Sequence, residues 1–167
     1  MPVADKFPQA WEGKPPERIW SAACRSYGLI WGLIGATVGE ELGSSGVKAI
    51  SKAMIKVAER QAGKAFESGR FPGNAKGMAE YMMIAEGTLG MLVETPAGAT
   101  EKRAAFRILK CPLHDDPKSE TTPAVCSAYS MFEKTSARIA NPKLNCTQTK
   151  VMSKGDPYCE WVFELEE

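Results

Sequence analysis

Apolar side chains recur at helical spacing through the first half of the chain. From Ile19 to Val38 they fall every three or four residues, which predicts a helix that begins near Pro15 or Pro16. The segment Gly43-Ser44-Ser45 breaks this pattern, and a second amphipathic stripe predicts a helix over residues 46–68. A third helix, rich in methionine, is predicted over residues 75–93.

The pattern becomes strand-like in the last third. Residues 103–110 predict a strand that leads to Cys111-Pro112, and a fourth helix is expected to start after Thr121 or Thr122. Residues 141–165 predict a β-hairpin that turns at Gly155-Asp156-Pro157. This order predicts an α+β fold, with N-terminal helices packed on a small antiparallel sheet closed by the C-terminal hairpin. We expect residues 17–167 to form a single domain, preceded by an extended arm over residues 1–16.

The second strand of the hairpin alternates cleanly between two faces. One face carries Cys159, Trp161, Phe163 and Leu165, and the other carries Tyr158, Glu160, Val162 and Glu164. A slip of one residue would expose the whole apolar set, so we expect its four members to be buried together. Cys159 should then lie close to Cys111 or Cys126.

The first predicted helix contains four glycines, at positions 28, 32, 35 and 39. Each costs about 1 kcal/mol of helix propensity relative to alanine. That cost is tolerable where another backbone or a ligand approaches closely. Close packing of helices is the first interpretation, and a wall of a ligand cavity or a dimer seam is the alternative.

Composition excludes several classes of function. The chain has 21 basic and 20 acidic residues, so it lacks the excess positive charge that attracts nucleic acid or anionic membranes. The uncharged run over residues 26–39 is too short to span a bilayer as a helix, and the first residues do not resemble a signal peptide. We therefore expect a cytoplasmic protein that binds neither nucleic acid nor membranes. Its five cysteines should be free thiols or thiolates.

An ordered series of short motifs in the last third carries a family resemblance. Phe106 to Pro112 ends in Cys-Pro, Thr122 to Cys126 follows, and then come Asn141-Pro-Lys, Thr149-Lys150 and Gly155-Asp156-x-x-Cys159. This series resembles the C-terminal half of the L-2-amino-thiazoline-4-carboxylic acid hydrolase-like family. Its hairpin is also similar to that of 4-vinyl reductase domains. The resemblance implies a small hydrolase that opens a C–N bond of a small heterocycle or cyclic amidine, without an organic cofactor.

The resemblance also implies candidate site residues. Cys111, Cys126 and Cys159 occupy the characteristic cysteine positions, and Asp156 is the turn acid. A thiolate or an activated water would attack the ring carbon, and Asp156 or His114 would move the proton. The alternative interpretation makes the cysteines small buried hydrophobes and Asp156 a simple turn residue.

Zinc is a second chemistry to consider. Cys111 and His114 have the spacing of a zinc-binding pair, which Cys126 and Cys159 would complete as a tetrahedral set.

A different class of function remains open beside the enzyme. The chain would then be a binding module for a small hydrophobic ligand, or an accessory subunit, as a homo-oligomer or in a larger complex. The methionines and aromatic residues of the predicted helices would line the pocket. The candidate pocket residues are Trp20, Tyr27, Trp31, Tyr81 and Met82.

Overall fold

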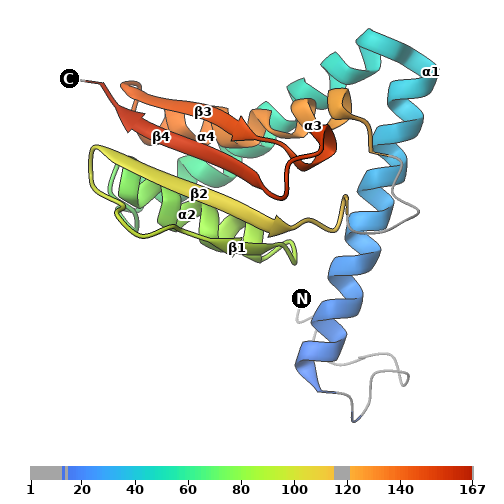
Figure 1. Cartoon of the computed structure of the whole chain (residues 1–167), viewed down its shortest axis with the longest axis horizontal. Helices are drawn as coiled ribbons and strands as arrows, with labels where there is room; N and C mark the ends of the chain where they lie inside the picture. The colour runs from blue at the N-terminus through green and yellow to red at the C-terminus, as the bar shows by residue number, and fades with distance from the viewer. Residues whose placement is uncertain (1–12, 14, 115–120, 167) are drawn as a thin grey trace.

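The computed structural model describes residues 13, 15–114 and 121–166. Its elements follow one another as α1 (Pro16–Glu67), α2 (Ala75–Gly87), β1 (Leu92–Glu94), β2 (Arg103–Lys110), α3 (Pro123–Tyr129), α4 (Met131–Ala140), β3 (Leu144–Lys150), a 3-10 turn (Met152–Lys154) and β4 (Cys159–Leu165). Figure 1 shows the helices gathered on one side of the sheet, so the predicted α+β class is confirmed. Residues 1–12 and 14 of the predicted arm lie outside the described residues.

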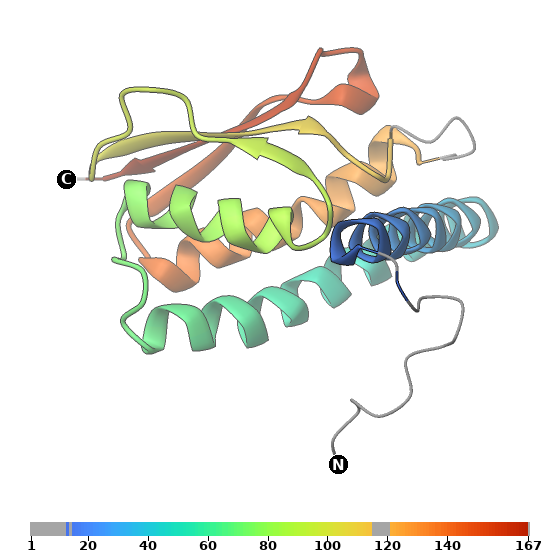
Figure 2. The ribbon, with the colours of Figure 1, turned by 90° about the horizontal axis from the view of Figure 1, so that it is seen from below.

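The sheet is open and has the strand order β1-β2-β4-β3, with every neighbouring pair antiparallel. The last strand of the chain therefore lies inside the sheet rather than at its edge. Figure 2 shows α2 and α4 against one face of the sheet, with the second half of α1 beneath them. The first half of α1 projects to one side of this layered body.

The predicted break in the first helical region is confirmed, and it occupies one residue. Gly43, inside α1, has a φ of 52° and a ψ of −133°, which are not helical, so α1 consists of two segments joined by a kink. Positive φ is accessible to glycine because it has no Cβ. After the kink, Gly46 lies directly against the backbone of Val38, which brings the two segments close together.

The predicted third helix is wrong at its end. It stops at Gly87, where the Thr88 hydroxyl donates to the carbonyl oxygens of Ile84 and Ala85 at 2.6 and 2.7 Å. Leu92–Glu94 forms the edge strand β1 instead, paired with β2. A methionine-rich apolar run fits a helix or a buried strand equally well, and pairing with β2 decides between them.

The predicted fourth helix is confirmed at its start and divided in two. Thr122 Oγ1 accepts a hydrogen bond from the backbone N–H of Val125 at 3.3 Å, which caps α3 as expected. The helix bends at Ser130, where ψ is 0°, and continues as α4.

The hairpin and its buried face are confirmed in part. Trp161 and Phe163 are buried, while Cys159 and Leu165 are only half-buried. Val162, predicted for the opposite face, is buried too. It lines a recess shared with residues 96–99, so the loop before β2 covers that face of the sheet.

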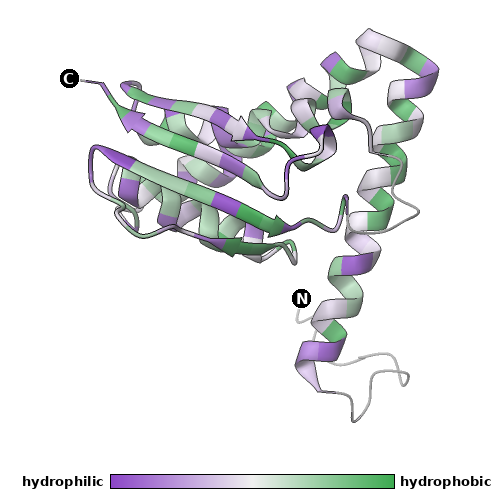
Figure 3. Ribbon diagram, in the orientation of Figure 1, coloured by the Kyte–Doolittle hydropathy of each residue, from purple (hydrophilic) through white to green (hydrophobic). Residues whose placement is uncertain are grey.

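The buried core lies between the sheet and the helices. Phe106 of β2 packs beside Trp161 of β4, with ring centroids 6.0 Å apart, and Met78 and Met82 of α2 are fully buried. Figure 3 shows hydrophobic residues on the strands and helices of this interface. It also shows hydrophobic residues along the projecting half of α1. No helix among the described residues is both long and apolar enough to cross a membrane.

Candidate ligand-binding cavity

A cavity of about 140 Å³ lies where the two segments of α1 meet the rest of the helical layer. Its walls come from both segments of α1, the end of α2, the Pro112-Leu113 segment after β2, and the α3–α4 bend. The lining residues are Tyr27, Gly28, Trp31, Met54, Val57, Gln61, Ala85, Glu86, Leu89, Met91, Pro112, Leu113, Tyr129, Phe132 and Glu133. A cavity of about 150 Å³ holds one benzene ring, so this one fits a molecule of a single ring.

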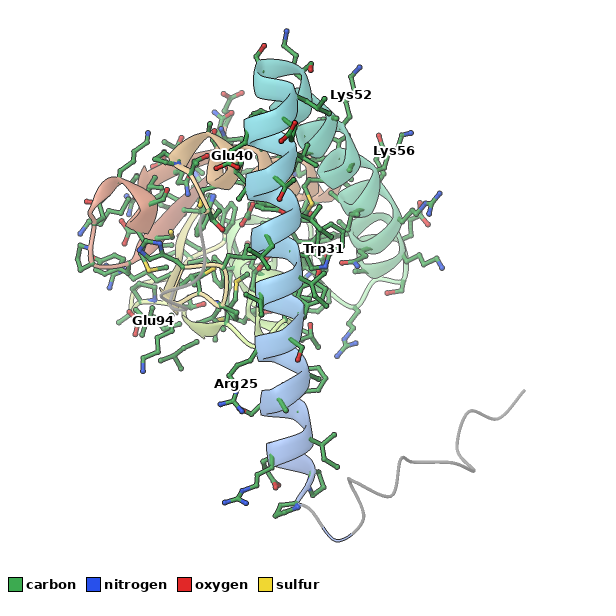
Figure 4. All side chains as sticks on the ribbon, turned by 90° about the vertical axis from the view of Figure 1, so that its right-hand side faces the viewer. Arg25, Trp31, Glu40, Lys52, Lys56 and Glu94 are labelled. Atoms are coloured by element: carbon green, nitrogen blue, oxygen red, sulfur yellow. The ribbon has the colours of Figure 1, made fainter. Side chains whose placement is uncertain are left out.

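Two glycines of α1 allow this wall to form. A Cβ at Gly28 would run into Pro112, and a Cβ at Gly35 would come within 2.8 Å of the Tyr129 hydroxyl. That hydroxyl donates a hydrogen bond to the carbonyl oxygen of Trp31 at 2.7 Å. The close-packing interpretation of these glycines is therefore confirmed, and Gly28 also lines the cavity. Figure 4 looks onto the exposed side of α1, with Trp31 near the middle of its projecting segment.

Two carboxyl groups reach this mostly apolar cavity. Glu86 of α2 and Glu133 of α4 are 4% and 5% exposed. Within the described part of the chain, the ion pairs involve Glu94, Glu160 and Glu164, and neither cavity carboxyl. Glu133 Oε2 is buried without a hydrogen-bond partner there. An unpaired buried charge is expensive, so such groups tend to hold a proton.

The electrostatics of the pair follow from this burial. Desolvation raises the pKa of Glu86 from its ordinary value of 4.5 to about 7. Desolvation, and then the charge of Glu86, raise the pKa of Glu133 well above the same value. Contact with its own backbone N–H in the first turn of α4, and then the charge of Lys134, oppose this rise. The two groups are therefore close enough to affect each other's protonation.

Two tyrosines lie close enough to Glu86 for its charge to change their pKa. Burial, and then the Glu86 charge, raise the pKa of Tyr27 above its ordinary value and that of Tyr81 to about 12. Both phenols are therefore neutral hydrogen-bond donors near neutral pH.

The predicted pocket residues divide between three places. Tyr27 and Trp31 line the cavity, with ring centroids 5.9 Å apart. Trp20 borders a separate open recess beside Cys24 and is 51% exposed. Tyr81 and Met82 are buried in the core and are not among the lining residues.

The structure gathers three of the predicted cysteines at one end of the sheet. Cys159 pairs with Ile108 across β2 and β4, so it lies near the point where β2 leads to Cys111. Ionisation of Cys126 or Cys159 would raise the pKa of Cys111, so the three thiols lie close enough to affect one another. The Cys159 sulfur accepts a hydrogen bond from the backbone N–H of Met152 at 3.3 Å.

All three thiols are protonated at neutral pH. Burial is the main cause that raises the pKa of Cys111, and it also raises that of Cys126. Burial raises the pKa of Cys159 to about 11, although the Met152 N–H opposes the rise. A reactive thiolate needs the opposite, an electropositive surrounding that lowers the pKa.

The other two candidate residues lie outside the cavity lining. Asp156 Oδ2 accepts a hydrogen bond from the backbone N–H of Val151 at 2.7 Å, as a turn residue does. His114 is exposed, and its backbone N–H donates to the Cys111 carbonyl. In residues 15–114 and 121–166, no group of three or more His, Cys, Asp or Glu side chains is arranged to hold a metal ion. The proposed zinc set of Cys111, His114, Cys126 and Cys159 is therefore not assembled.

The sequence matches the family described as L-2-amino-thiazoline-4-carboxylic acid hydrolase over residues 25–163. The chain belongs to this family. The match reaches well beyond the C-terminal motifs and includes every lining residue of the cavity. No curated protein matches the sequence.

Among solved structures, the fold is similar to that of trafficking protein particle complex subunit 3 from Naegleria fowleri, crystallised covalently bound to palmitic acid. The TM-score is 0.51 at 18% identity, and the alignment covers 82% of this chain and 95% of the other. At this identity the similarity shows the fold alone.

Sequence reasoning missed Glu86 and Glu133. A glutamate in an amphipathic helix normally faces solvent, but Glu86 lies four residues after Met82 and Glu133 four residues after Tyr129, which places both on an apolar helix face. Their position on the inward side of α2 and α4 was the only available signal.

Proposed function

We propose that this chain is a small hydrolase-like enzyme that opens a C–N bond of a small heterocycle or cyclic amidine in the cavity. The observation that carries the proposal is the pair of buried carboxyl groups, Glu86 and Glu133, in a single-ring cavity of a chain from this hydrolase family. A carboxyl group with a pKa near the working pH transfers protons efficiently in both directions.

The chemistry assigned to the pair is a proton relay. Water attacks the ring carbon of the amidine, and one carboxylate takes the proton that this water loses. The C–N bond then breaks, and the departing ring nitrogen takes a proton from the carboxyl group. The balance is one water consumed per ring opened, and neither carboxyl group changes its net protonation.

The thiols have a smaller part in this proposal. Their raised pKa values argue against a preformed thiolate nucleophile, and attack by water needs none. Cys111 supports the Pro112-Leu113 wall from outside the cavity lining.

Turnover of aminothiazoline carboxylate and related cyclic amidines tests the proposal. We expect Glu86→Gln and Glu133→Gln each to lower kcat by about 100-fold or more, the usual contribution of a proton-transfer group. Cys111→Ser, Cys126→Ser and Cys159→Ser should keep measurable turnover, and Glu80→Gln on the solvent side of α2 is the matched control. Full activity in both glutamine variants, or abolition by a single serine variant that still folds, would contradict it.

A second candidate function rests on a different observation. The projecting half of α1 exposes large apolar side chains, among them Trp20, Ile30, Ile34 and Leu42 at 51%, 55%, 46% and 58%. Exposed apolar side chains that gather in one patch commonly mark a contact surface. The solved structure of similar fold is named as a subunit of a complex. We infer that a second copy of this chain covers this row of exposed apolar side chains, because its central part, residues 26–39, carries no charge that would oppose a symmetric pairing of the same face.

Native mass spectrometry of freshly purified protein examines this second candidate. A homodimer is the expected result. A monomer at micromolar concentration, or a stoichiometric complex with another protein, would contradict the pairing of two copies. The same spectrum reveals any retained small molecule, which is the expected sign of a module that binds a hydrophobic ligand.

A further inference from the structure

Glu86 and Glu133 face the cavity from two different helices, and the polar groups around them do not neutralise their charge. The described ion pairs leave both out, and Glu133 Oε2 has no partner among the described residues. The other lining residues are mainly apolar or aromatic, so a ligand in this space meets two carboxyl groups in a setting of low polarity.

We propose that Glu86 and Glu133 together form a binding site for one compact cationic nitrogen group, of the amidinium, guanidinium or ammonium class, carried by the ligand of the cavity. A planar amidinium presents N–H donors to two carboxylates at once, and such charge-assisted hydrogen bonds are the strong ones. Tyr27 and Trp31 add aromatic faces beside the pair, which also attract cations. This inference deepens the proposed function, since it rests on the same cavity and names the charge of its substrate.

The protonation state of the two carboxyl groups should make cation binding depend on pH. In the empty cavity the raised pKa values keep at least one proton on the pair near neutral pH. A bound cation stabilises the carboxylates, so that proton leaves when the ligand enters, and affinity rises with pH from about 5 to 8.

The groups that face the pair do not titrate in this range. Tyr27 of α1, Tyr81 of α2 and Cys111 after β2 lie near Glu86, and each has a raised pKa. Near Glu133, the pKa of Cys146 of β3 is raised to about 12 and that of Cys159 of β4 to about 11, and Lys134 of α4 adds a cation.

The test is calorimetric titration with benzamidinium and with benzamide, its neutral counterpart of the same shape. We expect the wild-type protein to bind benzamidinium at least about tenfold more tightly, a difference of about 1.4 kcal/mol. Titrations at pH 6 in two buffers of different ionisation enthalpy should show net proton release on benzamidinium binding. Glu86→Gln and Glu133→Gln should each lose the preference, while Glu80→Gln retains it.

Equal affinity for the two probes, binding of neither probe, or binding without proton release would overturn the inference. The wild-type measurements suffice to decide this even if a glutamine variant fails to fold. Cation binding without hydrolytic turnover would remove the proposed enzyme and leave the site standing. Turnover of cyclic amidines without a preference for the charged probe would do the reverse.

Discussion

At the scale of single residues, the burial of ionisable groups dominates this molecule. Glu86 and Glu133 are carboxyl groups in an apolar wall, and Cys111, Cys126 and Cys159 are thiols shielded at the end of the sheet. Burial disfavours the charged form of both kinds of group. Each shift therefore has a consequence for stability or reactivity that can be measured without knowing the substrate.

Folding stability should fall as pH rises through the range in which the cavity carboxyls titrate. Their pKa is raised in the folded state, so the native protein binds more protons than the unfolded chain between about pH 4.5 and pH 7. The contribution of these two groups is fully present below about pH 4.5 and is lost as pH rises, and for Glu86 alone the loss should reach about 3 kcal/mol by pH 8. Urea unfolding at pH 5 and pH 8 measures this difference. Glu86→Gln should reduce it and Glu80→Gln should not, and a wild-type curve that rises over the range would contradict the assignment.

The clustered thiols should react slowly at neutral pH. A protonated thiol is a poor nucleophile, and the pKa of Cys159 is about 11. Alkylation with iodoacetamide, followed site by site by mass spectrometry, should be slower at Cys111, Cys126 and Cys159 than for free cysteine at pH 7. A single fast-reacting cysteine among the three would contradict this prediction and would support a mechanism with a thiolate nucleophile.

At the scale of elements, the position of α1 against the rest of the helical layer forms the cavity. Its first segment approaches Pro112 through Gly28 and the α3–α4 bend through Gly35, while the kink at Gly43 turns the second segment under α4. Small residues at the contact let the backbones approach closely, which larger side chains would prevent.

Two glycine substitutions in the same helix should have opposite effects. Gly28→Ala places a methyl group against Pro112 and should destabilise the fold by about 1–3 kcal/mol, as overpacking does. Gly63→Ala meets nothing within 4 Å and should stabilise it by about 0.5–1 kcal/mol through helix propensity. Chemical unfolding of both variants gives the comparison. Equal effects of the same sign would mean that α1 does not pack on Pro112 as described.

The β4 register can be tested at its central side chain. Trp161 is 3% exposed and packs beside Phe106, so Trp161→Ala should cost about 3–5 kcal/mol of unfolding free energy. Trp20→Ala, at a half-exposed position, is the matched control and should change the stability of the monomer little. A loss below about 1 kcal/mol for Trp161→Ala would be incompatible with this register.

At the scale of the whole molecule, the layered body and the projecting helix have different surfaces. Sheet and helices enclose the core on one side, whereas the first half of α1 shows its apolar row to solvent. The same segment forms one wall of the cavity, through Tyr27 and Trp31. Association through this row would therefore cover part of the surface next to the candidate cavity.

A charge introduced into the exposed apolar row should weaken the proposed homodimer. Ile34→Asp would bury a carboxylate in the paired interface, so we expect its dissociation constant to rise by at least about tenfold. Lys52→Asp, on the exposed side of the second segment, is the control. Sedimentation over a concentration series measures both, and an unchanged constant for Ile34→Asp would exclude the row as the interface.

Local pattern determined the elements, the fold class and the family. Period-3.6 stripes, the Thr122 cap and the alternation from Cys159 to Leu165 each depend on neighbouring residues only, and the structure contains the helices and strands that they predict. Local pattern did not predict where α2 ends or that β1 is a strand, because both depend on the hydrogen bonding of β1 to β2, which comes later in the chain.

Only the tertiary structure decided the candidate site. The cavity exists because a kinked helix, a Cys-Pro segment and a helical bend converge, and no local pattern encodes that convergence. The tertiary packing turned Glu86 and Glu133 inward, where desolvation changes their protonation, and it left Tyr81 and Met82 in the core. Residue types thus set which elements form, whereas the burial of particular side chains sets the chemistry. Burial depends on contacts between segments far apart in the sequence.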